Sequence, residues 1–163
     1  MINRLEIIHN IIEFHHTIRS ELQSVGQSVN DLEAVFRLRG EYAGWSQSSM
    51  VSLAERTNKI KENLKSLEEG LCQHFTYEED NLPPVLGEVM MKGLLFEHSA
   101  IRREIKAANA VVFSTEYDSM ERDEAILQKS RLQQVILNLA QNIEKHASRE
   151  EIVLDMACKG LES

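Results

Sequence analysis

Four histidines and two glutamates stand out because they interrupt apolar stripes that recur at helical spacing. They are His15, His74, Glu78, His98, His146 and Glu150. Each of four stripes contains one histidine, and two of the stripes carry a glutamate four residues after it. A buried ionised glutamate without a partner costs on the order of several kcal/mol or becomes protonated. A pair of metal ions shared by these imidazoles and carboxylates would meet that need, so we predict a two-metal site.

The same residue types recur in an internal repeat. The segment from His15 to Arg19 and the segment from His98 to Arg102 both read H-x-x-I-R. Residues 74–79 and 146–151 both read H-x-x-x-E-E. The first half of the chain therefore resembles the second, as a pseudo-twofold site between two helix hairpins requires. The repeat selects His15 over its neighbour as the predicted ligand.

Apolar residues recur at spacings of three and four along most of the chain, which indicates helices. We expect helices over about 3–24, 48–80, 87–113 and 118–158, the last of them kinked or broken early, and a short extra helix at 31–39. Pro83 and Pro84 would end the second helix, and Asp118 with Glu121 resembles a capping box. The pattern predicts an all-α fold, a four-helix up-down-up-down bundle in a single domain of residues 1–163.

Chain direction alternates along such a bundle. Ligands near the starts of the first and third helices would therefore meet ligands near the ends of the second and fourth. At a rise of about 1.5 Å per residue, the four histidines lie roughly 9 to 18 Å from the same end of the bundle. They can share one layer, and Glu78 and Glu150 both step toward that end.

Composition limits the class of protein. The chain has 163 residues and a formal net charge of −8, with 18 Lys and Arg against 26 Asp and Glu. Such an acidic chain repels phosphate backbones, so we expect no nucleic-acid partner. No apolar run approaches the roughly 20 residues of a membrane span, and Arg4 and Glu6 interrupt the apolar start, unlike a secretory signal. We expect a soluble, cytoplasmic protein.

The order His, H-x-x-x-E, E-H-x-x-I-R, H-x-x-x-E-E resembles that of the hemerythrin-like (HHE cation-binding) family. The segments EEDNLPPVL after His74 and EEIVLDMA after His146 are similar to the family's segments at those places. The resemblance implies a non-haem di-iron site in which Glu78 and Glu150 bridge two iron ions. It implies four terminal ligands, His15, His74, His98 and His146.

Two departures separate the chain from the oxygen-carrying hemerythrins. Those proteins have a further histidine four residues after the third-helix histidine, where this chain has Arg102. They have an aspartate five residues after the last histidine, where this chain has Glu151 and instead offers Glu150 at four. The pattern is closer to the broader bacterial-type HHE domains, which argues against simple reversible oxygen transport.

Imidazole and carboxylate ligands suit iron, zinc or manganese, and the absence of thiolates argues against copper(I) or an iron–sulfur cluster. Two metals with these six ligands need water, oxo or hydroxo groups to complete their coordination. Open positions would admit dioxygen, nitric oxide or peroxide. We expect five apolar side chains to limit water around the site: Leu71, Phe75, Leu94, Ile101 and Ile143. The leading prediction is a di-iron protein that binds or reacts with such a ligand in sensing, scavenging or protection.

Two alternatives stay open. Iron storage, delivery or iron-centre repair would use the same ligands. A structural interaction module, acting as a homodimer or on a protein partner, would carry a vestigial or zinc-filled site. No nucleotide loop or catalytic triad pattern is present, no organic substrate is specified, and enzyme status stays open.

Other residues near the predicted ligands have a structural interpretation. His9, Glu13 and His16 form a stripe on the flank of the first helix, which is more typical of a polar or interface face than of an accessory metal site. Cys72 points away from the neighbouring ligand histidine and is not expected to bind metal. Cys158 is expected to pack in the C-terminal tail.

The charged residues beside the motifs are less constrained. Arg19 and Arg102 either approach the site glutamates or lie on the surface. Glu79, Asp80 and Glu151 are expected to be solvated carboxylates, with a role beside the metal ligands left open for Glu151.

Some larger side chains complete the interpretation. Met90, Met91 and Met156 are expected to fill the core. Tyr42 and Trp45 fall between the first two helices, where they would cover one end of the bundle or contact a partner.

Overall fold

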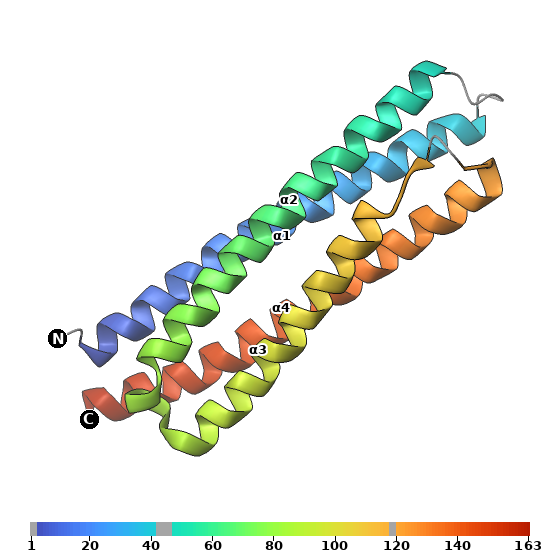
Figure 1. Cartoon of the computed structure of the whole chain (residues 1–163). Helices are drawn as coiled ribbons and strands as arrows, with labels where there is room; N and C mark the ends of the chain where they lie inside the picture. The colour runs from blue at the N-terminus through green and yellow to red at the C-terminus, as the bar shows by residue number, and fades with distance from the viewer. Residues whose placement is uncertain (1–2, 42–46, 118–119) are drawn as a thin grey trace.

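The computed structural model describes residues 3–41, 47–117 and 120–163, apart from the side chains of 38–41 and 47–52. Its four long helices are α1 (Arg4–Glu41), α2 (Gln47–Asn81), α3 (Pro83–Phe113) and α4 (Arg122–Glu162). Each helix packs against its neighbours in the chain, and α1 also packs against α4. Figure 1 shows the resulting up-down-up-down bundle, with both termini at the same end as the α2–α3 turn. The predicted all-α four-helix bundle is confirmed.

The first helix is longer than the sequence pattern suggested. We expected it to fade near residue 24 and a separate short helix to follow, but α1 is a single helix that ends at Glu41. Its second half continues the apolar stripe with four buried side chains, Val25, Val29, Leu32 and Phe36. Burial of this stripe against the other helices outweighs the weaker helix preference of the polar residues between them. Tyr42 and Trp45 lie outside the described residues.

The two prolines between α2 and α3 have two effects. Pro83 and Pro84 end α2 at Asn81, as predicted, but they also form the first turn of α3. Proline suits that turn because its missing N–H would have had no helical partner. The expected start at Gly87 is therefore four residues late. Gly87 still marks a break, because its φ of 78° and ψ of 173° lie outside the helical region.

The last helix begins later and ends later than expected. Glu121 occupies the N-cap position of α4 and makes no capping hydrogen bond with its side chain, so its predicted place inside a capping box is wrong. Asp118 lies outside the described residues. From Arg122 the helix continues past Cys158 to Glu162 without an internal break, so the expected early kink is also wrong.

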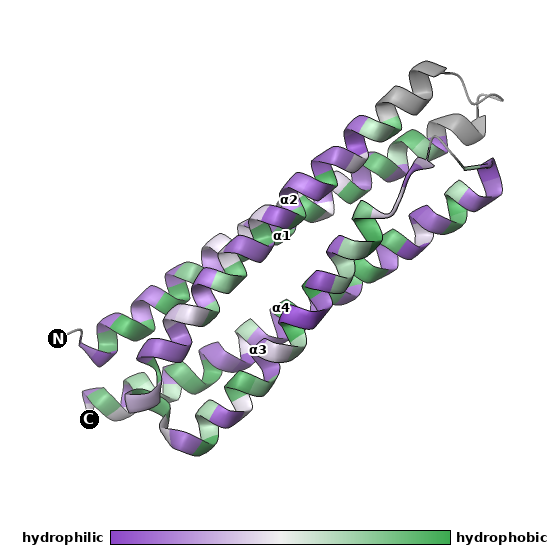
Figure 2. Cartoon of the chain, viewed as in Figure 1, coloured by the Kyte–Doolittle hydropathy of each residue, from purple (hydrophilic) through white to green (hydrophobic). Residues whose placement is uncertain are grey.

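Buried apolar side chains form two clusters that meet at the predicted ligands. The smaller cluster lies toward the termini and comprises Ile7, Ile8, Ile11, Leu82, Met91, Leu94 and Leu154. The larger cluster continues from Ile18 and Phe75 toward the other end of the bundle. In Figure 2 hydrophobic and hydrophilic residues alternate along each helix, as expected for helices with one buried face. Within the described residues, no helix has the length and apolar character needed to cross a membrane.

The three methionines assigned to the core behave differently. Met91 is buried, but Met90 is 46% exposed and Met156 is 68% exposed. Consecutive residues on a helix are rotated by about 100°, so Met90 cannot share the inward face of Met91. Met156 follows the buried Leu154 by two residues and for the same reason points outward.

Gly87 offers a test of the break in α3. An L-residue in its conformation costs about 1–3 kcal/mol, so Gly87→Ala is expected to lower the free energy of unfolding by that amount. Gly93 is the matched control, because it lies inside the same helix and a Cβ added there would have no heavy atom within 4 Å. Gly93→Ala is expected to raise stability by about 0.5–1 kcal/mol. Urea unfolding of both variants measures the difference, and a neutral Gly87→Ala would contradict the assigned strain.

Candidate metal centre

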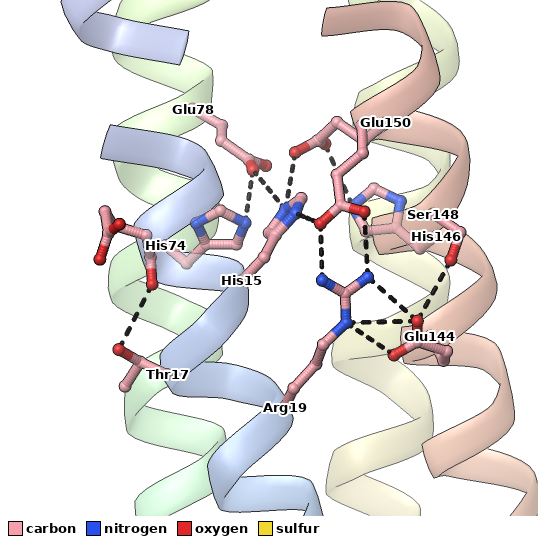
Figure 3. A network of polar contacts seen from close by, with 11 residues as sticks. His15, Thr17, Arg19, His74, Glu78, Glu144, His146, Ser148 and Glu150 are labelled. Atoms are coloured by element: carbon pink, nitrogen blue, oxygen red, sulfur yellow. Dashed lines mark hydrogen bonds and ion pairs between the residues drawn. The ribbon is translucent and has the colours of Figure 1, made fainter. Parts of the chain in front are cut away.

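The structure brings all six predicted ligand side chains into one buried layer. One histidine comes from each helix, and the two glutamates come from α2 and α4. None of the six residues is more than 5% exposed. Figure 3 shows five of them converging between the helices: His15, His74, Glu78, His146 and Glu150.

The side chains form two groups that share both glutamates. The first group adds His15 and His74 to the shared pair, and the second adds His98 and His146. Within each group, one potential ligand atom per residue lies within 4.8 Å of all the others. Each group could hold one metal ion, and the shared carboxylates lie where they could contact both ions.

The imidazoles turn their Nε2 atoms toward the glutamates. Nε2 of His74 lies 2.5 Å from Glu78, and Nε2 of His98 lies 2.8 Å from the other oxygen of the same carboxylate. The remaining two have Nε2 at 3.0 and 3.3 Å from the carboxylate of Glu150: His15 and His146, respectively.

Several of these inward atoms have no hydrogen-bond partner among the described residues. They include Nε2 of three histidines, both oxygens of Glu78 and one oxygen of Glu150. A buried polar atom left without a partner costs about 1–3 kcal/mol. Metal coordination would satisfy these atoms together, and nitrogen and oxygen donors of this kind suit a divalent transition metal. The donor set therefore fits a cation.

Burial also shifts the protonation of the metal-free site. It raises the pKa of Glu78 to about 10, so this carboxyl group is protonated at neutral pH. It lowers the pKa of His74 to about 3 and that of His98 to about 4. Burial opposes protonation of His15 as well, but contacts with Glu150 and Glu78 outweigh it and raise the pKa to about 10. Metals bind deprotonated ligands, so loading the site must release protons.

Outside this layer, α1 and α4 are joined by a network around Glu151. Its carboxylate accepts from Arg19 at 2.6 Å and lies 3.0 Å from Nδ1 of His15. Arg19 also donates to Glu144, which places the guanidinium between two α4 carboxylates (Figure 3). Arg19 thus approaches the site through Glu151 and not by pairing with its glutamates. A hydrogen-bonded carboxylate behind a ligand histidine fixes the ring and raises its basicity.

The internal repeat places the same arrangement between α2 and α3. Nδ1 of His98 lies 2.9 Å from Glu79, and the same oxygen accepts from Arg102 at 2.8 Å. The Arg102 guanidinium also lies 5.2 Å from the ring centre of Phe75, whose ring stacks on His98 at 3.9 Å. The expectation that Glu79 is merely solvated is therefore wrong, whereas Asp80 is exposed as expected.

The other two histidines differ from each other on their outer side. Nδ1 of His146 lies 2.6 Å from Glu97, which also pairs with Arg149 at 2.5 Å. Nδ1 of His74 has no hydrogen-bond partner in the described part of the chain. The ring of Phe14 lies 5.3 Å from the His74 ring instead. The two halves of the site are therefore chemically unequal beyond their ligands.

Sequence reasoning missed Glu97 as a site residue, and only a faint signal could have found it. Glu97 directly precedes His98, and Phe14 holds the same place before His15 in the repeat. A difference between otherwise matching segments is visible in the sequence. Which side chain on another helix it faces is not.

The remaining expectations concern residues around the centre. The five apolar side chains expected to surround the site are buried: Leu71, Phe75, Leu94, Ile101 and Ile143. Among the residues that the structure describes, neither metal-capable group includes His9, Glu13 or His16, and all three are exposed. Cys72 is exposed, and Cys158 packs against the smaller cluster.

The pKa shifts predict how the stability of the metal-free protein changes with pH. His15 and Glu78 keep protons up to about pH 10 in the folded chain, whereas their ordinary values are 6.5 and 4.5. The unfolded chain therefore binds fewer protons above pH 6.5, and the free energy of unfolding falls as pH rises toward 10. Each group contributes a slope of up to about 1.4 kcal/mol per pH unit.

Urea unfolding in the presence of a chelator, at about pH 6.5 and about pH 8.5, measures this slope. Glu78→Gln should make the slope shallower, because the amide cannot titrate. The metal-loaded protein should not share the loss, since the ions take the place of the protons. A metal-free protein that gains stability over this interval would contradict the assignment.

A comparison with protein families agrees with this geometry. The family model described as the hemerythrin HHE cation binding domain matches residues 6–157. No curated protein and no solved structure gives a match to the chain. The matched range contains all six side chains of the buried layer and most of the four helices. On the extent of this match, the chain belongs to the hemerythrin HHE cation-binding domain family.

Proposed function

We propose that the buried layer holds two iron ions. Glu78 and Glu150 would bind both ions, and each ion would take two further histidines from one of the two groups. The observation that carries this proposal is that the same two glutamates belong to both groups. A single-metal site would have no use for the second pair of imidazoles, which are equally buried.

We further propose that the centre binds or reacts with dioxygen, nitric oxide or peroxide, in sensing, scavenging or protection. Iron held by imidazole and carboxylate, with positions left open, can bind such ligands and exchange electrons with them. The chain's own residues would set the surroundings. Phe75 and its apolar neighbours exclude bulk water, and Glu79 and Glu151 hold two ligand rings in place. We expect the protein to act in the cytoplasm, as argued from its sequence.

Metal analysis of the purified protein, followed by optical spectroscopy, tests the proposal. Two irons per chain and an absorption spectrum that changes when nitric oxide is added to the reduced protein are expected. Iron that binds without any response to these ligands would favour storage, delivery or repair. A zinc-containing or metal-free protein whose stability is unchanged by a chelator would overturn the proposal.

Two adjacent histidines provide a matched pair of variants for this test. His15 is 1% exposed and belongs to the first group, whereas His16 is exposed and belongs to neither. His15→Ala should reduce the iron content, and His16→Ala should leave it unchanged. Equal iron content in the two variants would count against the proposed ligand set.

A further inference from the structure

A groove between α3 and α4 reaches one of the shared glutamates. It encloses about 240 Å³, and its lining includes Glu150, whose side chain is only 2% exposed. The other lining is largely apolar and comes from both helices: Leu86, Val89, Met90, Leu94 and Val153. We call this cavity the α3–α4 groove. It links a surface of apolar side chains to a carboxylate of the buried layer.

The charged groups of the α3–α4 groove are already paired. Glu97 and Arg149 both line it, and they contact each other at 2.5 Å. The second oxygen of Glu97 lies 2.6 Å from Nδ1 of His146. Arg149 therefore offers no unpaired positive charge to an anion, and Glu150 would repel one. The groove favours a neutral, apolar molecule.

A second cavity provides an internal comparison. It lies between α1 and α4, encloses about 190 Å³ and is lined mainly by apolar residues, among them Leu22, Val25, Leu67 and Ile136. None of the six candidate ligands lines it. Each cavity has one glycine with open space around its Cβ position, Gly93 in the α3–α4 groove and Gly26 in the α1–α4 cavity. The same substitution can therefore fill either cavity without a steric clash at Cβ.

We propose that the α3–α4 groove is the path by which a small neutral gas molecule, of the class of nitric oxide or dioxygen, reaches the centre beside Glu150. The inference rests on the proposed function in requiring a ligand that reacts at the metal. It adds where that ligand enters and which helix pair admits it. Gly93 is the position at which the path is narrowed most simply, because it carries no side chain of its own.

Xenon binding tests the groove without any metal. Apolar cavities of about 150 Å³ bind xenon, so crystals of the metal-free protein under xenon pressure should show it in the α3–α4 groove. Gly93→Leu should remove that xenon, and Gly26→Leu should leave it in place. A groove that takes up no xenon in the unmodified protein would overturn the inference.

The rate of nitric oxide binding to the reduced, iron-loaded protein tests the path itself. Gly93→Leu is expected to slow association by about tenfold or more, with iron content unchanged, and Gly26→Leu should bind at the unmodified rate. Val89→Trp, at an exposed position of the same groove, serves as a second obstruction should Gly93→Leu fold poorly. Unmodified protein that binds no nitric oxide would refute the proposed function. Normal binding that neither groove variant slows would refute only the path.

Discussion

Alanine in place of Glu78 or Glu150 is expected to remove at least one of the two proposed metal ions and to weaken binding of the other. Each carboxylate belongs to both groups, so its loss leaves both positions short of a ligand. Removing a residue that merely supports a ligand costs about 10–100-fold in metal affinity, and loss of a shared ligand should cost more. Metal content after desalting, measured per chain, records the effect.

Two further variants separate metal loss from misfolding. Glu78→Gln keeps the shape of the side chain and resembles the protonated carboxyl group expected in the metal-free protein. It should fold normally and still bind metal poorly. Glu13→Ala removes an exposed glutamate from α1 and should retain full metal content. If both Glu78→Ala and Glu150→Ala keep two ions per chain, the sharing of these carboxylates is wrong.

Glu97→Gln is expected to weaken one metal position about 10–100-fold and to leave the other nearly unchanged. The carboxylate of Glu97 holds Nδ1 of His146, so the substitution removes a charge that raises the basicity of this ligand. His74 has no such support among the described residues, because Phe14 lies beside its ring. The position that uses His74 should therefore already be the weaker one.

Competition titration against a chelator should show this inequality as two binding steps in the unmodified protein. Glu97→Gln should bring the two steps closer together by weakening the tighter one. Glu13→Gln, the same change on an exposed face, should leave both steps as they are. A single step in the unmodified protein, or equal weakening of both positions by Glu97→Gln, would contradict the difference between the two halves.

The helix ends show why local sequence predicts some boundaries and misses others. Pro83 and Pro84 end α2 for a local reason, since proline cannot continue a helix, and this boundary was predicted. The continuation of α1 through Gly26 and the polar residues after it depends on burial of Val29 and Leu32 against other helices. Local helix preference is weak compared with that burial, so the sequence suggested an interruption where there is none.

The sequence by itself determined the helical period, the four apolar stripes and the six polar side chains that interrupt them. Those features follow from spacing along one helix, which neighbouring elements cannot alter. Only the tertiary structure decided which side chains stand behind the ligands. His15 meets Glu151 across 136 positions of the chain, and His146 meets Glu97 across 49. Such partners depend on the axial offset and rotation of packed helices, which arise from the packing of whole faces and leave no local pattern.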